Sequence, residues 1–393
     1  MSSFGKQISA TNYTIHNKVE LVRGGKKYFD VLEHIINRAH TILHLQMYIF
    51  NDDETGSRII NALLKAAERG VQIFIVLDGY ASRTISKSSI ENLKSAGINF
   101  RWFNPIFKSR YFYFGRRLHH KVVVADASVG LVGGVNITNR YNDLDNPAWL
   151  DWALHVQGEV CLQLNKICAE IWNKSHWGKR RFTRFIHPVK TAKHDEECLV
   201  RTRVNDWVHG KKQITKTYIE MLKKAQYSII IMSSYFLPGL LIKKHLKAAS
   251  KRGVRIKIIV AGISDIQLAK QAERYMYSWL FKNNIEIYEY KKTVLHGKLS
   301  TCDEKFVTVG SYNINNISAY ASIELNVDVM DTTFAKKTEA SLQKVISSES
   351  IEITQAAYTK KQTVFVHAWQ RICFDTYRII LYLFTFYFKR RHG

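Results

Sequence analysis

Apolar positions along the chain follow two periods, one typical of helices and one typical of buried strands. Near the amino terminus, Tyr28, Leu32 and Ile36 recur at the three- and four-residue spacing of one helix face. Residues 41–50 and 71–77 are apolar, β-rich runs of strand length. Helices that alternate with buried strands predict an α/β fold.

The same order of elements occurs twice. The matching segments are 41–50 with 228–236, 64–73 with 246–256, and 98–100 with 285–287. We therefore expect a tandem duplication whose halves pack about a pseudo-twofold axis, with an active-site cleft between them. The predicted divisions are a first domain at 1–178, a basic linker at 179–197, a second domain at 198–350 and a tail at 351–393.

Each half contains the pattern His-x-Lys-x4-Asp at the start of an apolar run. The two copies are His119, Lys121 and Asp126, and His296, Lys298 and Asp303. Glycine follows each histidine by 14 residues and asparagine by 17, which places Asn136 and Asn313 in register. Residues i and i+2 of a strand face the same side, so each histidine should project beside its lysine, and His120 should face the opposite side.

An imidazole that attacks or protonates, beside an ammonium group that holds oxygens, suits phosphodiester chemistry. We expect one histidine to attack phosphorus and the other to protonate the leaving oxygen. Lys121, Lys298, Asn136 and Asn313 would hold the phosphate oxygens. The spacing alone does not say which histidine has which role.

The doubled motif resembles that of the phospholipase D superfamily, and in detail the chain is most similar to bacterial cardiolipin synthases without amino-terminal membrane helices. The resemblance implies tandem α/β/α sandwich domains and a phosphohistidine intermediate, with His119 as nucleophile and His296 as acid and base. It implies no cofactor. Asp126 and Asp303 belong to the catalytic motif, but we expect them to act mainly in structure.

Two acids, Asp151 and Glu324, follow the motif histidines by about 30 residues. Catalytic imidazoles commonly need a carboxylate on the second ring nitrogen. By the same resemblance, Asp151 should serve His119 and Glu324 should serve His296. The alternative is that both acids end strands and face solvent.

Net charge is +25, which implies an anionic partner. The five cysteines show no metal-ligand spacing, so we expect no metal. The amino terminus does not read as a signal peptide, and no apolar run is long enough to span a membrane. An aromatic and basic segment at 103–118 should border the site, either as a lipid-contacting rim or as a packed loop.

The tail combines aromatic and basic residues in the manner of an amphipathic helix that lies on a membrane surface. Its candidate membrane residues are Trp369, Phe384, Phe386, Tyr387, Phe388, Lys389, Arg390 and Arg391. The alternative is a helix packed on the body of the protein. The expected location is the cytoplasmic face of the bacterial inner membrane, as a peripheral protein.

Four functions fit these features to different degrees. The first is cardiolipin synthesis from two phosphatidylglycerol molecules with release of glycerol. The others are a hydrolytic phospholipase D, a nuclease of the same superfamily, and a non-catalytic membrane scaffold. Two complete motifs argue against the scaffold, and the aromatic tail favours lipid over nucleic acid. The choice between water and a lipid alcohol as acceptor stays open.

Overall fold

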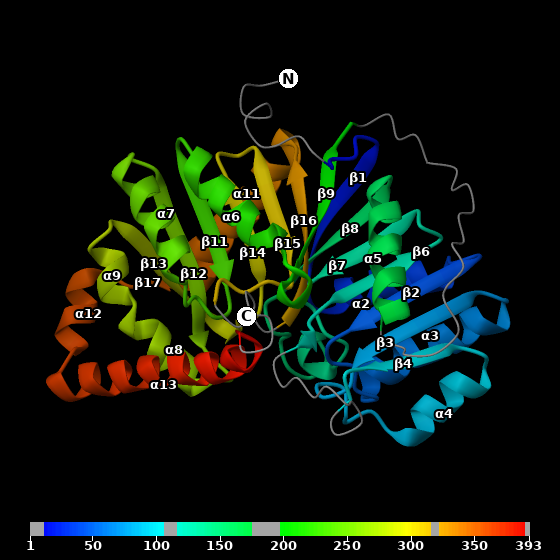
Figure 1. Ribbon diagram of the computed structural model, residues 1–393. Coiled ribbons are helices and arrows are strands. Elements are labelled where there is room, and N and C mark those ends of the chain that lie inside the picture. Colours follow the sequence, from blue (N-terminus) through cyan, green and yellow to red (C-terminus); the bar gives the residue numbers. More distant parts are fainter. Residues whose placement is uncertain (1–11, 106–115, 175–196, 316–321, 390–393) are drawn as a thin grey trace.

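Two mixed sheets lie side by side, one from each half of the chain (Figure 1). This computed structural model describes residues 12–105, 116–174, 197–315 and 322–389, the last nine through their backbone alone. The first sheet has the order β1-β8-β7-β6-β2-β3-β4. Its strands are β1 (Asn17–Arg23), β2 (Ile42–Met47), β3 (Gln72–Asp78), β4 (Asn99–Phe103), β6 (Lys121–Ala125), β7 (Val129–Gly133) and β8 (Trp152–Gly158).

The second sheet repeats this order as β9-β16-β15-β14-β11-β12-β13, with β10 and β17 added at its two edges. Its strands are β9 (Leu199–Asp206), β10 (Lys211–Lys212), β11 (Ser228–Ser233), β12 (Arg255–Ile263), β13 (Ile285–Val294), β14 (Lys298–Cys302), β15 (Phe306–Gly310), β16 (Ser322–Met330) and β17 (Ser350–Glu352). In both sheets the strands β2-β3-β4 and β11-β12-β13 run parallel, and their partners β6 and β14 run antiparallel to them. The predicted α/β duplication is confirmed.

Helices cover both faces of each sheet. They are α2 (Lys26–Asn37), α3 (Glu54–Glu68), α4 (Lys87–Ser95), α5 (Val160–Lys174), α6 (Gln213–Lys224), α7 (Leu240–Lys251), α8 (Gln267–Tyr275), α9 (Tyr277–Phe281), α11 (Thr332–Glu349), α12 (Gln355–Lys361) and α13 (Val364–Lys389). Apolar residues of α2 to α4 form one core with the first sheet, and α6, α7 and α9 form another with the second. Met276 separates α8 from α9.

The halves share a third apolar core. It combines α5 and α11 with the facing strands of both sheets, for example Leu154 of β8 and Val309 of β15. The short strand β5 (Arg117–Leu118) also crosses between the halves and pairs with β16 of the second sheet. Burial of apolar surface on this scale makes the two halves one folding unit rather than two independent domains.

The last helix, α13, runs along one edge of the second half and packs on α8 (Figure 1). Cys373 and Tyr377 are buried in a small cluster with Ala269, Ala272 and Met276. Within the described residues, no helix is both long and apolar enough to cross a membrane.

Candidate active site

Both motif histidines face one cavity of about 540 Å³ between the halves. His119 and His296 each lie two residues before a motif strand, β6 or β14, so corresponding strand ends position the two imidazoles. Asn136 and Asn313 line the same cavity, as the repeated spacing predicts. Residues far apart in sequence therefore meet at a single site.

The acids pair with the histidines in a crossed arrangement, so the predicted pairing is wrong. His119 Nδ1 lies 2.8 Å from Glu324 Oε2, and His296 Nδ1 lies 2.6 Å from Asp151 Oδ2. Each histidine is thus oriented by the carboxylate of the other half. Both acids are fully buried, which also excludes the alternative of strand-end acids in solvent.

Strand order explains the crossing. In each sheet one strand, β7 or β15, separates the motif strand from the strand of the acid. Two strand spacings place the acid about 9–10 Å from its own histidine, beyond contact. Backbone hydrogen bonds between the halves instead hold each histidine next to the acid of the other half. His119 N donates to Ile323 O at 3.0 Å, and His296 N donates to Leu150 O at 2.7 Å.

The two carboxylates have unequal hydrogen-bond partners. Glu324 accepts hydrogen bonds from Ser311 Oγ at 2.5 Å and from Ser322 Oγ at 2.6 Å, in addition to its contact with His119. Asp151 accepts one from the Trp152 backbone N–H at 2.7 Å.

The difference between the carboxylates begins in the sequence, because Ser311 stands where the first half has Gly134. A Cβ at Gly134 would collide with the Asp151 carboxylate, so that position leaves room for the acid but supplies no hydroxyl.

These surroundings give the two carboxyl groups different pKa values. Burial alone would raise the pKa of Glu324, but His119 and the hydroxyl of Ser311 help to lower it to about 2. Burial raises the pKa of Asp151 to about 7, against the lowering effect of Lys298. Burial also lowers the pKa of both histidines. At neutral pH the His119 pair therefore carries an ionised carboxylate and a neutral imidazole, whereas Asp151 of the His296 pair is near the midpoint of its titration and holds a proton in about half of the molecules.

The two lysines lie beneath the histidines and are almost fully buried. Lys121 Nζ donates to His119 O at 3.0 Å and lies 4.9 Å from the centre of the Tyr48 ring. Lys298 Nζ donates to His296 O and lies 3.0 Å from His296 Nδ1. Burial lowers the pKa of Lys121 to about 7 and that of Lys298 to about 8. Neither lysine is among the residues that line the cavity, and their ammonium groups lie behind the two histidines, against the histidine carbonyl oxygens.

The motif aspartates lie in tight turns after β6 and β14, where both have positive φ. Asp126 accepts hydrogen bonds from three consecutive backbone N–H groups at 40–42, at 2.8–2.9 Å. Asp303 does the same for residues 226–228 at 2.8–2.9 Å. Each therefore fixes the start of the adjacent antiparallel strand, β2 or β11, as expected of a structural residue. His120 faces away from the site, with Nδ1 3.0 Å from Gln46 Oε1.

The motif asparagines connect the cavity wall to adjacent loops. Asn136 Oδ1 accepts from the Ile49 backbone N–H at 3.2 Å, and its Nδ2 donates to the Tyr141 hydroxyl at 3.0 Å. Asn313 Oδ1 accepts from Ser234 Oγ at 2.7 Å. These contacts orient both amides at the cavity surface.

Aromatic and charged residues outside the motifs complete the cavity. Tyr48 stands edge-on to His119 at 4.7 Å between ring centres, and Tyr141 does so to His296 at 5.3 Å. The remaining residues that pattern reasoning did not assign include Arg140, Trp149, Tyr235, Asp265, Asn315, Tyr377 and Ile380. The sequence held a signal for Arg140, which follows Asn136 of the first motif by four residues, but none for Asp265 or for the two residues of α13.

Several expected features lie outside the described residues. These are the segment 106–115, most of the linker 179–197, the tail residues Arg390 and Arg391, and the side chains of Phe384, Phe386, Tyr387, Phe388 and Lys389. Trp369 lies on α13 with 56% of its surface exposed. Among the described residues, no group of three or more His, Cys, Asp or Glu side chains is arranged to hold a metal ion.

Comparison with known proteins gives a consistent result. A family model described as "Cardiolipin synthase, PLD-like domain" matches residues 32–172 and 218–346. Cardiolipin synthase B of Salmonella typhimurium is 31% identical over 350 residues, which cover 88% of this chain and 84% of the relative. Cardiolipin synthase B of Escherichia coli K12 is 30% identical over the same length, and cardiolipin synthase 1 of Bacillus anthracis is 28% identical over 353 residues, covering 87% of this chain and 68% of the relative.

The fold also matches a solved structure. Phosphatidylserine synthase from Haemophilus influenzae Rd KW20 aligns with a TM-score of 0.71 over 97% of this chain and 98% of that chain. Sequence identity is 12%, so this likeness concerns the fold alone.

Proposed function

This chain belongs to the phospholipase D-like cardiolipin synthase family, and we propose that it transfers a phosphatidyl group from one phosphatidylglycerol to a hydroxyl of another, forming cardiolipin and releasing glycerol. The observation that carries the proposal is the pair of crossed histidine–carboxylate contacts at one cavity. One imidazole can attack phosphorus while the other handles the proton of the leaving and entering oxygens.

In the first step, His119 Nε2 attacks phosphorus and the bond from phosphorus to the glycerol oxygen breaks. His119 suits this role because Glu324 accepts its Nδ1–H and stays ionised, which leaves a neutral, oriented imidazole. The His296–Asp151 pair retains a proton near neutral pH and gives it to the departing glycerol oxygen. The product is a phosphatidyl group bound to His119.

In the second step, His296 takes the proton from a hydroxyl of the second phosphatidylglycerol. That oxygen attacks phosphorus, the phosphorus–nitrogen bond breaks, and cardiolipin leaves. Lys121 and Lys298 would stabilise the charge on the phosphate oxygens from behind the histidines, and Asn136 and Asn313 would donate from the cavity wall. One phosphodiester is exchanged for another, so no external energy source is needed.

We further propose that the protein acts as a peripheral protein on the cytoplasmic face of an anionic bacterial bilayer. The support is the net charge of +25 together with the exposed apolar side chains of α13, among them Phe365, Trp369 and Ile372. These three residues are spaced four and three positions apart and therefore share one helix face. The opposite face of the helix packs on α8.

The test is incubation of purified protein with phosphatidylglycerol vesicles, followed by mass spectrometry of the lipids and measurement of released glycerol. We expect cardiolipin and glycerol in equal amounts, and reversal of the reaction by excess glycerol. Phosphatidic acid as the sole product would establish a hydrolase instead. Absence of lipid turnover together with DNA degradation would favour a nuclease.

A further inference from the structure

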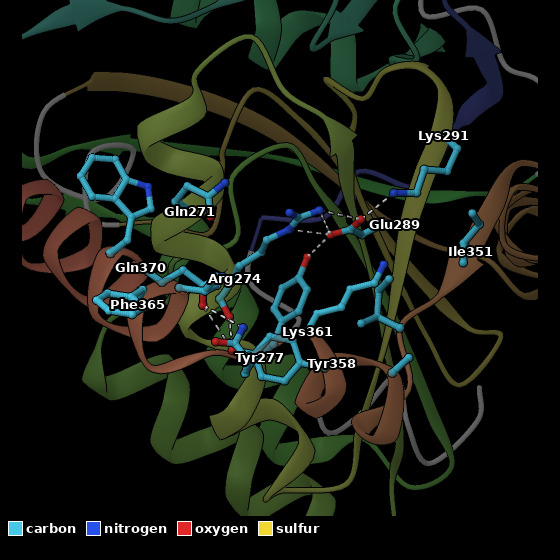
Figure 2. A pocket seen from close by; sticks show the side chains of 15 residues that line it. Gln271, Arg274, Tyr277, Glu289, Lys291, Ile351, Tyr358, Lys361, Phe365 and Gln370 are labelled. Carbon is cyan, nitrogen blue, oxygen red and sulfur yellow. Dashed lines mark hydrogen bonds and ion pairs between the residues drawn. The ribbon is translucent and has the colours of Figure 1, made fainter.

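A second cavity, of about 640 Å³, lies away from the catalytic residues, where α8, β13, α12 and α13 meet (Figure 2). Its wall combines Arg274 of α8, Lys291 of β13 and Lys361 of α12 with Phe365 and Trp369 of α13. Neither motif histidine lines it. The cavity therefore takes no part in the proposed chemistry, although α8 and α13 border both cavities.

Positive charge is in excess in this cavity. Glu289 is the acid in its wall, and Lys291 Nζ lies 2.7 Å and Arg274 Nη2 3.2 Å from its carboxylate (Figure 2). Lys270 approaches the same carboxylate at 3.0 Å from within the protein. The single carboxylate of Glu289 thus contacts three cations. Lys361 is exposed and forms no ion pair with any described residue.

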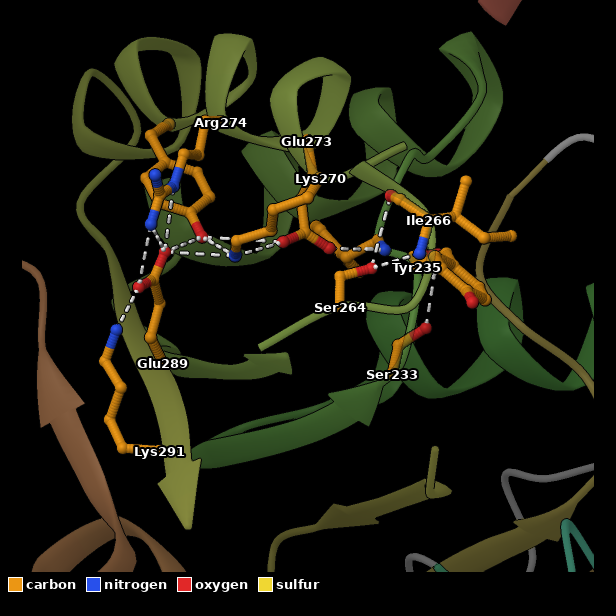
Figure 3. A network of polar contacts seen from close by, with 11 residues as sticks. Ser233, Tyr235, Ser264, Ile266, Lys270, Glu273, Arg274, Glu289 and Lys291 are labelled. Carbon is orange, nitrogen blue, oxygen red and sulfur yellow. Dashed lines mark hydrogen bonds and ion pairs between the residues drawn. The ribbon is translucent and has the colours of Figure 1, made fainter. Parts of the chain in front are cut away.

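The cations are also accessible. The side chains of Arg274 and Lys291 are both 37% exposed although they hold Glu289. Lys270 has a second buried partner, Glu273, at 2.9 Å (Figure 3). The outer cations can therefore turn donors toward an anion without leaving a buried charge unpaired.

Beside these cations lies an unusually apolar surface. Phe365 is 87% exposed and Trp369 is 56% exposed, and both lie on the outward face of α13 next to the cavity. Ile351 of β17, which is 56% exposed, extends the apolar surface on the other side. A ligand that matches both parts must carry an anionic group and hydrocarbon together.

We propose that this cavity binds the headgroup phosphate of an anionic phospholipid, with the acyl chains lying along the exposed face of α13. Arg274, Lys291 and Lys361 would donate to the phosphate oxygens. A soluble phosphate would use the cations alone and leave Phe365 and Trp369 exposed, so the apolar surface favours the lipid.

The site also has a physical connection to the catalytic cavity. Glu273, the inner partner of Lys270, accepts a hydrogen bond from the Phe236 backbone N–H at 2.9 Å. The preceding residue, Tyr235, lines the catalytic cavity and donates to Asp265 at 2.5 Å. A lipid bound in the second cavity would therefore be linked to the wall of the catalytic cavity by this chain of contacts, from Lys270 through Glu273 to the backbone beside Tyr235.

The experiment measures lipid binding without turnover, in full-length protein carrying His119→Ala. Vesicles contain brominated phosphatidylglycerol or brominated phosphatidylcholine, and the signal is the quenching of Trp369, obtained by subtracting that of the same protein with Trp369→Phe. The test variants are Lys361→Glu and Lys291→Gln. The controls are Lys361→Arg and Lys65→Glu, since Lys65 is also an exposed lysine in the last turn of a helix and forms no ion pair with any described residue.

We expect stronger quenching by phosphatidylglycerol than by phosphatidylcholine. Lys361→Glu should raise the half-saturating lipid concentration about fivefold, whereas both controls should change it by no more than about twofold. Equal effects of Lys361→Glu and Lys65→Glu would overturn the proposal, because attraction to the membrane would then depend on overall charge.

Two further outcomes separate the alternatives. If glycerol 3-phosphate competes with the lipid as well as short-chain phosphatidylglycerol does, the ligand is a soluble phosphate and the lipid proposal is overturned. Because the binding signal needs no turnover, it is independent of the proposed reaction. Cardiolipin formation by the wild type with no charge-dependent quenching would refute the second site alone.

Discussion

At the scale of single residues, the difference between Gly134 and Ser311 makes two similar motifs unequal. The serine hydroxyl donates to Glu324, whereas the glycine leaves Asp151 without such a partner. A carboxylate with more donors holds its charge more firmly in a buried site. The repeated sequence motif therefore contains two different acid–histidine pairs.

Removal of the Ser311 hydroxyl by Ser311→Ala should weaken the His119 pair. Loss of a hydrogen bond to a buried charge should lower kcat by about tenfold or more. It should also raise the pKa of Glu324. The acidic limb of the pH profile, where activity is lost as Glu324 is protonated, should therefore shift to higher pH. The measurement is the pH profile of kcat on phosphatidylglycerol vesicles. An unchanged acidic limb would mean that Ser311 does not tune Glu324.

Replacement of the acid that holds the extra proton gives a sharper prediction. Asp151→Asn should lower kcat by about 10²–10⁴-fold on phosphatidylglycerol, because glycerol is a poor leaving group without an acid. With a nitrophenyl phosphodiester, which needs no acid, the variant should release one equivalent of nitrophenol in a burst and retain the lipid on His119. Glu324→Gln should show no burst. The reverse result would exchange the roles of the two histidines.

The pKa of Asp151 near 7 also predicts the pH dependence of the wild type. The proton on the His296–Asp151 pair is present below about pH 7 and is lost as the pH rises, so glycerol departure should slow. Lys121 and Lys298, with pKa values of about 7 and 8, lose positive charge in the same direction. The rate on phosphatidylglycerol should therefore fall on the alkaline side, as measured under single-turnover conditions. The nitrophenyl substrate should be less affected.

At the scale of elements, the two faces of α13 have different surroundings. Cys373 and Tyr377 fix one face to the body, and the exposed face carries Phe365, Trp369 and Ile372. The sequence predicted a choice between a membrane helix and a packed helix. The described part of α13 is packed on one side and apolar on the other, and its contact with a bilayer stays a prediction.

Truncation after Ile380 tests the end of the helix, since it keeps the buried Cys373 and Tyr377 and removes residues 381–393. Vesicle binding should fall, because each terminal basic residue near an anionic surface contributes about 1 kcal/mol. Turnover of a short-chain soluble phosphodiester should change little. Vesicle flotation and a soluble assay measure the two quantities. Equal binding by the truncated protein would remove the terminal residues from the membrane contact.

Sequence patterns predicted the elements better than the contacts between them. The repeated strands and the two motifs follow from periodicity and spacing, which depend on local structure. The pairing of His119 with Glu324 does not, because it depends on which strand lies between β6 and β8 and on how the halves meet. The second cavity was missed for the same reason, since its wall comes from six elements.

At the scale of the whole molecule, the shared core and the crossed contacts make each half depend on the other. If residues 1–178 and 198–393 are produced as two chains in one cell, they should copurify and form cardiolipin. Either chain alone should expose its apolar interface and be inactive. Activity of one half alone, including a dimer of that half, would show that the crossed acids are dispensable.

The buried ammonium groups of Lys121 and Lys298 predict independence from added metal, since they can stabilise phosphate charge. Cardiolipin formation should therefore continue after exhaustive dialysis against a chelator. The control is a nuclease of known magnesium dependence in the same buffer. Loss of activity that only one divalent ion restores would contradict this expectation.

The crossed pairing also bears on synthesis of the protein at the ribosome. His119 emerges about 200 residues before Glu324, the acid that orients it. A nascent first half therefore carries the proposed nucleophile without the carboxylate that orients it. On the proposed mechanism, lipid exchange would begin only when translation has passed Glu324 and the second half has folded against the first, so incomplete chains should be inactive.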